Sequence, residues 1–140
     1  MNQYVRGVIA GLIATIVLSI LMYLKNMMGL MPDVDVIAML AGKMGGGAMM
    51  GWVGHFMIGA IIYGLAFAII GGKLPGGNNI NRGIVLGVIG WLIMMLMLMP
   101  MMDGGMFGMK MQSGMMVPVA TLMLHIIFGA VLGFAYNKLG

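Results

Sequence analysis

Residues 55–60, HFMIGA, lie in a long apolar segment and recur as HIIFGA at residues 125–130. The His, Gly and Ala positions keep the same spacing in both copies, at an offset of 70 residues. An aspartate precedes each copy at the same distance, Asp33 in the first and Asp103 in the second, in a methionine-rich connection. This repetition predicts two copies of one unit, a hairpin of two membrane-spanning helices.

Composition places the chain in a lipid bilayer. Of the 140 residues, 62% are hydrophobic and only 7% are charged, and the mean hydropathy is +1.11. A soluble domain contains roughly 25% charged residues, so this chain has too little polar surface to face water. The absence of cysteine excludes disulfides, zinc–thiolate sites and thiol catalysis. The net charge of +4 indicates membrane orientation and not nucleic-acid binding, because no basic cluster exists.

Four segments are apolar over about the length that a bilayer requires. They are predicted at residues 7–24, 48–70, 83–99 and 117–136. The connection at residues 71–82 is a turn rich in Gly, Pro and Asn. In the first outer connection, Pro32 and Asp33 form a helix-start signal, and Gly45 follows a short stretch at helical spacing. We expect a short interfacial helix there.

The two hairpins are expected to form one transmembrane domain over residues 1–140, with repeat one at about 4–71 and repeat two at about 80–138. Residues 6–14 and 82–90 share an Arg-Gly-x-x-x-Gly pattern, which extends the repeat. Each unit has an even number of spans, so both units point the same way across the membrane. The predicted fold class is an all-α, integral membrane four-helix bundle of two tandem parallel two-helix repeats, with short interfacial helices in the outer connections.

The distribution of Lys and Arg predicts the orientation. Four basic residues fall on the side that carries both termini, and three fall on the other side together with all three acids. We expect a multi-pass protein of the bacterial inner membrane, with both termini in the cytoplasm. The two methionine-rich connections are then outside.

Small residues at helical spacing predict the faces on which the spans pack, because helices in lipid associate through close backbone approach. Intramolecular packing is one interpretation of these stripes, and an interface with a partner or a second copy is the alternative. The predicted packing positions are Gly7, Gly11, Gly59, Gly83, Gly87, Gly90 and Gly129.

The 22 methionines are unevenly distributed. Apart from Met1, nine lie between Met22 and Met57 and twelve between Met94 and Met123. Methionine is a flexible side chain suited to surfaces that adapt to a partner or a lipid-like ligand. It is also a soft ligand that selects Cu(I), and its thioether absorbs oxidants. These three interpretations stay open.

His55 and His125 occupy equivalent positions in the second and fourth spans. An ionisable residue inside a span is costly and therefore indicates a function. Two histidines facing each other suit a bis-histidine haem b or a shared metal. The candidate metal ligands are His55, His125, Asp33, Asp103, Met99 and Met101. The alternatives are neutral imidazoles bonded to the backbone or to these aspartates, or a proton-linked role.

Catalytic patterns are missing from the sequence. It has no Glu, no Ser or Thr placed beside a His, no phosphate-binding glycine loop and no HExxH motif. We therefore expect no enzymatic activity. We also expect no cofactor, with copper or haem b as the alternatives.

Four stretches of the chain are similar to a family of small bacterial four-helix inner-membrane proteins, a domain of unknown function. They are GWVGHFMIGA at 51–60, WLIMM at 91–95 with Met99 and Pro100, GGMFGMK at 104–110, and TLMLHIIFGAVLG at 121–133. The resemblance covers nearly the whole chain. It implies four spans, an inner-membrane location and the two histidine-containing helices, and it brings no catalytic assignment.

These patterns predict a non-catalytic integral membrane protein that packs, as a small accessory or assembly subunit, against a larger membrane complex or a second copy. The alternative is a copper- or haem-binding or transport protein that uses His55, His125 and the methionine-rich outer face. A proton-coupled carrier is the third possibility.

Overall fold

The computed structural model describes residues 1–30, 35–101 and 104–140, and all regular structure in these ranges is helical. Asp33 and Asp103, the acidic half of the repeated pattern, lie outside the described residues. In chain order the elements are α1 (Gln3–Met27), α2 (Val36–Met44), α3 (Ala48–Phe56), η1 (Met57–Tyr63), α4 (Gly64–Ile70), η2 (Gly71–Lys73), α5 (Asn79–Ile93), η3 (Met94–Leu98), α6 (Met99–Met101), η4 (Met106–Gly108) and α7 (Met116–Leu139).

Four helical stretches are long and apolar enough to cross a membrane: Gln3–Met27, Ala48–Lys73, Asn79–Met101 and Met116–Leu139. We refer to them as spans 1 to 4. The predicted all-helical, four-span fold is confirmed, and the chain is a multi-pass membrane protein. Span 3 ends later than predicted, because the helix continues through Pro100 to Met101.

The short helix expected in the first connection is α2, although its start differs from the prediction. The N-cap is Asp35, whose side chain accepts a hydrogen bond from the Ala38 backbone N–H at 3.1 Å. Gly45 ends the helix in a left-handed conformation at φ 74°, which glycine adopts without steric cost. Asp35 therefore caps the interfacial helix, and the predicted start at Pro32 and Asp33 lies outside the described residues.

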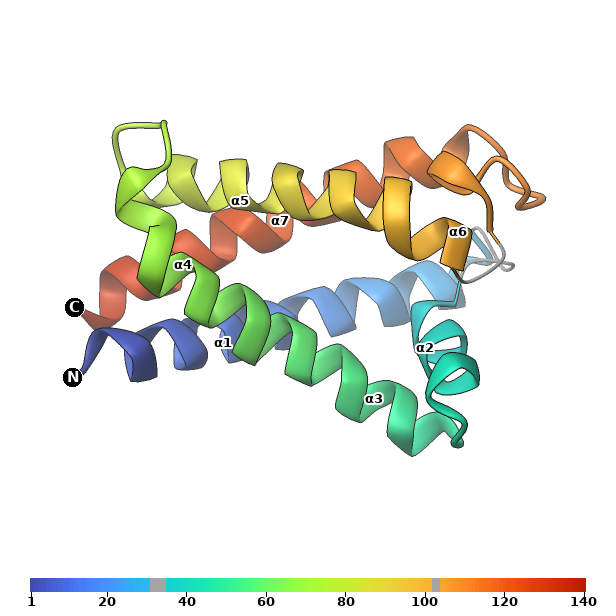
Figure 1. Ribbon diagram of the computed structural model, residues 1–140, viewed down its shortest axis with the longest axis horizontal. Helices are drawn as coiled ribbons and strands as arrows, with labels where there is room; N and C mark the ends of the chain where they lie inside the picture. Colours follow the sequence, from blue (N-terminus) through green and yellow to red (C-terminus); the bar gives the residue numbers. More distant parts are fainter. Residues whose placement is uncertain (31–34, 102–103) are drawn as a thin grey trace.

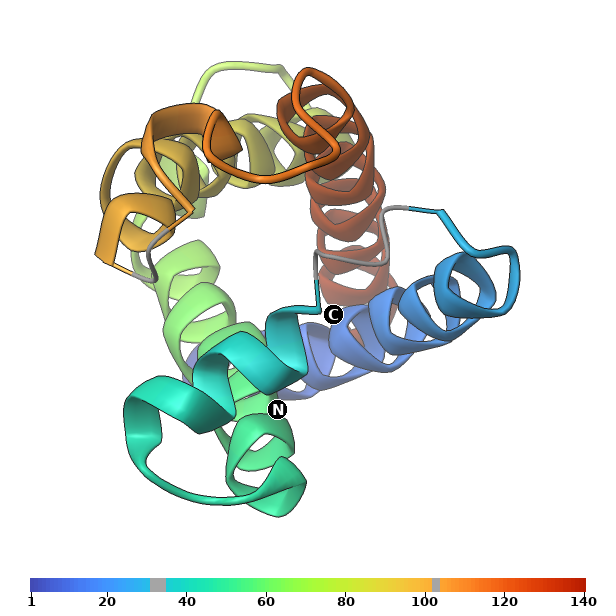
Figure 2. The same cartoon turned by 90° about the vertical axis from the view of Figure 1, so that its right-hand side faces the viewer.

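Spans 1 and 2 pack as one pair and spans 3 and 4 as another, and α1 also packs against α7. Both termini lie at one end of the bundle, which we call the terminal end (Figure 1). The opposite end carries α2, α6 and η4, and we call it the methionine-rich end. Seen from there, the four spans surround a common axis (Figure 2). Spans 2 and 3 converge at the terminal end and diverge toward the methionine-rich end (Figure 1).

Glycine brings the helices of each pair into backbone contact. A Cβ atom at Gly83 would collide with the Gly129 carbonyl oxygen, and a Cβ at Gly129 would collide with the Gly83 carbonyl oxygen. In the first pair, a Cβ at Gly11 would lie 2.6 Å from the Gly59 carbonyl oxygen. Lipid-embedded helices gain their association energy from this kind of contact.

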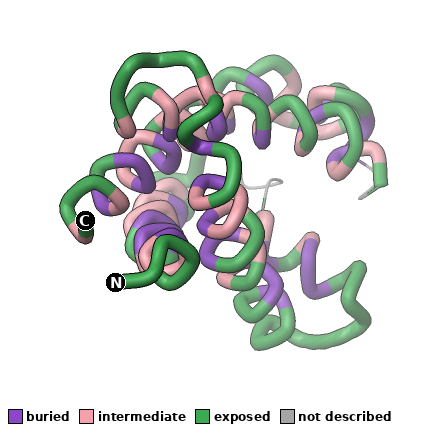
Figure 3. Tube along the Cα trace, turned by 60° about the vertical axis from the view of Figure 1, so that its left-hand side comes forward, coloured by how far each residue is buried: buried purple, intermediate pink, exposed green. Residues whose placement is uncertain are grey.

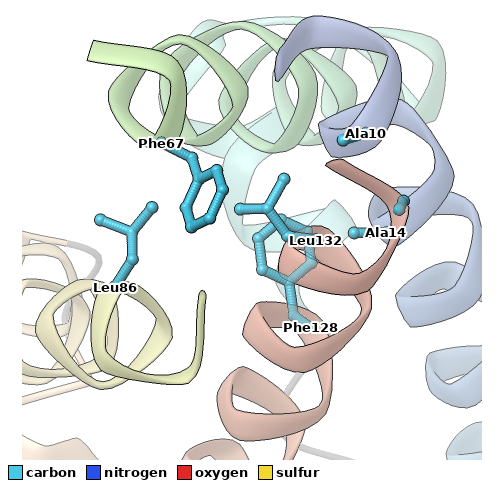
Figure 4. Close-up of a cluster of buried hydrophobic side chains, with 7 residues drawn as sticks. Ala10, Ala14, Phe67, Leu86, Phe128 and Leu132 are labelled. Atoms are coloured by element: carbon cyan, nitrogen blue, oxygen red, sulfur yellow. The ribbon is translucent and has the colours of Figure 1, made fainter. Parts of the chain in front are cut away.

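Two clusters of buried side chains lie at different depths. The first occupies the terminal half and joins all four spans, through Ala10, Ala14, Phe67, Leu86, Phe128, Leu132 and Ala135 (Figure 4). The second lies near the methionine-rich end and consists of Met95, Met99 and Val117, with Trp91 and Phe107 packed against it. Buried positions alternate with exposed ones along each span, as expected for helices that face lipid on one side (Figure 3).

Replacing Gly129 with Ala tests the importance of the backbone contact. The added methyl group meets a carbonyl oxygen that cannot rotate away, so we expect a loss of about 1–3 kcal/mol in the free energy of unfolding. The measurement is reversible unfolding in mixed detergent micelles. Gly42→Ala is the matched control, because a Cβ there meets no atom within 4 Å. Equal stability of the two variants would contradict the proposed role of the contact.

Candidate functional site

A cavity of about 460 Å³ lies between the spans. All four spans contribute to its wall, and most of the lining side chains are apolar. They include Leu18 and Met22 from span 1, Ile58, Ile62 and Ala66 from span 2, Leu86, Ile89, Ile93 and Met94 from span 3, and Leu124 and Phe128 from span 4. A site of this size and polarity is typical of small-molecule binding.

The cavity ends near the middle of the bundle. Its floor includes Tyr63 and Phe128, whose rings meet edge to face with centroids 5.0 Å apart, and Ala66 and Leu86 line it farther toward the terminal end. Phe128 belongs to the buried cluster of the terminal half, and Tyr63 packs against that cluster. The terminal half is therefore closed beneath the cavity.

The mouth of the cavity is at the methionine-rich end, where Lys25, Asn26 and Asp35 line it. Thr15, near the floor, is eleven positions from Asn26 along α1, a rise of about 16 Å. This is roughly half of a 30 Å hydrocarbon core. The cavity thus spans one half of the membrane.

Two π-helical segments border the cavity from opposite spans. They are η1 in span 2 and η3 in span 3. Ile58, Ile62 and Tyr63 of η1 and Met94 and Met97 of η3 line it. A π-helical turn is wider than an α-helical one, is rare, and occurs frequently at functional sites. The sequence carries no pattern that predicted either segment.

His55 lines the cavity and is 8% exposed. Its Nε2 atom lies 3.2 Å from the Ser19 hydroxyl oxygen. Ser19 already donates its only hydroxyl hydrogen to the Thr15 carbonyl oxygen at 2.7 Å. His55 must therefore be the donor, so its neutral ring carries the hydrogen on Nε2. The Trp52 and Phe56 rings pack beside it.

His125 also lines the cavity but is bonded differently. Its Nδ1 atom lies 2.8 Å from the Thr121 carbonyl oxygen, which can only accept a hydrogen bond. The neutral ring therefore carries its hydrogen on Nδ1 and has a free lone pair on Nε2. The two histidines line one cavity, yet His55 bonds to a side chain of span 1 and His125 to the backbone of its own span, so they are not equivalent in hydrogen bonding.

Tyr63 is a cavity residue that the sequence reasoning missed. Its hydroxyl lies against the Gly90 backbone, where a Cβ atom would collide with it. No hydrogen-bond partner for this hydroxyl exists among the described residues. Tyr63 therefore provides a hydrogen-bond donor at the floor. A tyrosine at mid-span in an apolar helix was the available signal.

The predicted metal ligands do not form one cluster in the described part of the chain. No group of three or more His, Asp or Glu residues is close enough there to hold a metal ion. Met101 lines the mouth of the cavity, whereas Met99 is fully buried beside Met95 and Val117 and does not line it. Asp33 and Asp103 are not described.

The predicted packing glycines occupy two kinds of position. Most lie at contacts between the backbones of paired spans, but a Cβ at Gly59 would meet the side chain of Thr15, and Gly90 lies against the Tyr63 hydroxyl. Gly90 also lines the cavity. The absence of a side chain at Gly90 thus makes room for the tyrosine.

Comparison with known families gives a match over the whole chain. A family of unknown function, DUF6789, matches residues 1–140. Comparisons with curated proteins and with solved structures find no match.

The different bonding of the two histidines is measurable by ¹⁵N solid-state NMR in lipid bilayers. For the neutral rings, we expect the hydrogen on Nε2 of His55 and on Nδ1 of His125. Ser19→Ala removes the acceptor of His55, so the ring shifts of His55 should change while those of His125 stay the same. The same tautomer at both rings would disprove the assignment.

Proposed function

The chain belongs to the DUF6789 family of unknown function, and we propose that it is a non-catalytic membrane protein that binds a mostly apolar small molecule between its spans. The observation that carries this proposal is the cavity of about 460 Å³, which is apolar along its wall and polar at its two ends. Binding sites for small molecules commonly combine an apolar wall with a few polar groups that fix orientation.

An apolar cavity inside a membrane is unfavourable to leave empty. Its lining loses dispersion contacts, and water gains too few hydrogen bonds there to fill it. A chain-like or ring-containing apolar molecule restores those contacts. The depth of about 16 Å limits it to a molecule that extends across one half of the bilayer.

Methionines give the cavity an adaptable wall in the half nearer the methionine-rich end. Met22, Met94, Met97 and Met101 all line it. Unbranched thioether side chains change shape at little cost, which suits the entry of a flexible molecule. This use accounts for part of the uneven methionine distribution. We place the methionine-rich end outside and both termini in the cytoplasm of a bacterial cell, following the distribution of Lys and Arg.

A second candidate function is the small accessory subunit of a larger membrane complex. It is favoured by exposed methionines at the methionine-rich end, such as Met49, Met101 and Met106, because their flexible side chains suit contact with a partner. Copper or haem binding is favoured by His125 alone, whose Nδ1–H bond to a backbone carbonyl is typical of metal-ligating histidines.

A tryptophan placed in the cavity tests the ligand-binding function. Ile89→Trp and Leu92→Trp are matched, because both residues are on α5 and 39% exposed, but only Ile89 lines the cavity. The probe is a dodecane that carries a photoreactive diazirine, added to phosphatidylcholine nanodiscs. We expect Ile89→Trp to reduce labelling of cavity residues about tenfold, the equivalent of 1.4 kcal/mol. Leu92→Trp should have no effect.

Equal labelling of both variants, or labelling confined to lipid-facing residues, would refute the ligand-binding proposal. An absorption spectrum and metal analysis of the same preparation decide the metal alternative. A Soret band or stoichiometric copper would favour it, and the absence of both would remove it.

Purification in mild detergent tests the accessory-subunit proposal. A subunit of a complex should elute with a stoichiometric partner, and Leu92→Trp, which enlarges a lipid-facing side chain, serves as a probe of the interface. Migration of the untagged protein alone in every detergent tested would argue against this role.

A further inference from the structure

The floor of the cavity carries polar groups whose hydrogen-bonding roles are defined. The Tyr63 hydroxyl has no partner among the described residues and lies against Gly90 of the opposite span. A hydroxyl hydrogen without a partner in an apolar site costs about as much as a lost hydrogen bond. Tyr63 therefore favours a ligand that presents an acceptor at this depth.

His125 supplies the complementary role nearby. The bond from its Nδ1–H to the Thr121 carbonyl oxygen leaves the Nε2 lone pair as an acceptor. His125 is three positions from Phe128 on α7, so the two side chains share a helix face. The Phe128 ring contacts the Tyr63 ring. The Tyr63 hydroxyl lies against Gly90, and Gly87, one turn away on α5, lies against the His125 backbone, so the donor and the acceptor lie within about one helical turn in depth.

The other polar groups of the floor are already bonded. The Thr15 hydroxyl donates to the Gly11 carbonyl oxygen at 2.7 Å, and the Ser19 hydroxyl donates to the Thr15 carbonyl oxygen. His55 uses its Nε2–H for Ser19 and keeps a lone pair on Nδ1, but it is eight positions from Tyr63 along span 2, a rise of about 12 Å. Near Tyr63, the donor of its hydroxyl and the acceptor of His125 are thus left for a ligand.

A hydroxyl group matches this pair, because its oxygen accepts one hydrogen bond and its hydrogen donates another. A ketone, ester or carboxylate only accepts, and would leave the His125 lone pair without a donor. A hydrocarbon satisfies neither group. The remaining length of the ligand must be apolar, because the wall above the floor is formed mainly by Leu, Ile and Met side chains.

We propose that the cavity binds a lipophilic alcohol or phenol, with its hydroxyl at the floor between Tyr63 and His125 and its apolar body extending toward the mouth. This inference rests on the proposed ligand-binding function and specifies the chemical class of the ligand. It requires no bond to form or break. The two hydrogen bonds and the apolar contacts are the whole interaction.

Competition with a matched series of molecules tests the inference. The labelled probe is a dodecanol that carries a diazirine, in phosphatidylcholine nanodiscs. The competitors are dodecanol, its methyl ether and dodecane, compared at equal measured concentrations in the membrane. The alcohol satisfies both groups, the ether accepts only from Tyr63, and the alkane does neither. We expect each lost hydrogen bond to weaken competition about fivefold.

Tyr63→Phe removes the donor and keeps the ring that contacts Phe128. We expect this variant to bind dodecanol about fivefold more weakly. The ether and the alkane should then compete equally well with the labelled probe. Tyr23→Phe is the matched control, because Tyr23 is 64% exposed on α1 and does not line the cavity. Its competition series should equal that of the unmodified protein.

The outcomes separate the two proposals. Cavity labelling with equal competition by alcohol, ether and alkane, and no effect of Tyr63→Phe, would overturn the hydroxyl assignment and leave the ligand-binding function standing. Absence of cavity labelling by both the alcohol and the alkane probe would overturn both. A difference between ether and alkane that disappears in Tyr63→Phe but persists in Tyr23→Phe, with the alcohol the best competitor in each, supports both.

Discussion

Backbone contact at glycine is the interaction on which the rest of the structure depends. In a bilayer the apolar side chains gain little by leaving lipid, so helices associate where their backbones can approach closely. Gly11 and Gly83 make this approach to span 2 and span 4, respectively. The cluster of buried side chains that joins the four spans lies in the terminal half. Toward the methionine-rich end, spans 2 and 3 diverge (Figure 1). The cavity exists because the close packing of the four spans ends partway across the membrane.

The two hairpins use their glycines in different registers. Gly59 lies against Gly11, whereas its counterpart Gly129 lies against Gly83, which corresponds to Gly7 in the Arg-Gly pattern. The second hairpin is thus offset by about one helical turn from the first. Equivalent positions in the sequence consequently meet different neighbours. The bonding of the histidines differs for a further reason, because the position that matches Ser19 in the second hairpin is Met95, and His125 bonds to a backbone carbonyl of its own helix instead.

Features that depend on composition and local pattern were predictable from the sequence. The four spans follow from uninterrupted apolar segments, and the short helix α2 follows from its spacing and its terminal glycine. The cap of α2 was assigned to Asp33 instead of Asp35 because both aspartates precede the same apolar stretch. Both histidines line one cavity, but a shared binding site stays a prediction, and no group of three or more His, Asp or Glu residues comes together in the described part of the chain.

Features that depend on tertiary geometry were not predictable. The π-helical segments η1 and η3 consist mainly of Met, Ile and Leu, as ordinary spans do, and no local pattern marks the wider turn. The role of Tyr63 required knowledge that Gly90, on another span, leaves space for its hydroxyl. The hydrogen position on each histidine depends on whether a serine hydroxyl or a backbone carbonyl lies beside the ring.

The position of the cavity in one half of the membrane couples its occupancy to the state of a single leaflet. A molecule that fills the cavity adds contacts only in the methionine-rich half, because the terminal half is already closed by packed side chains. The concentration of the molecule in that leaflet therefore sets the occupancy of the cavity. A molecule confined to the opposite leaflet leaves the cavity empty until it crosses the membrane.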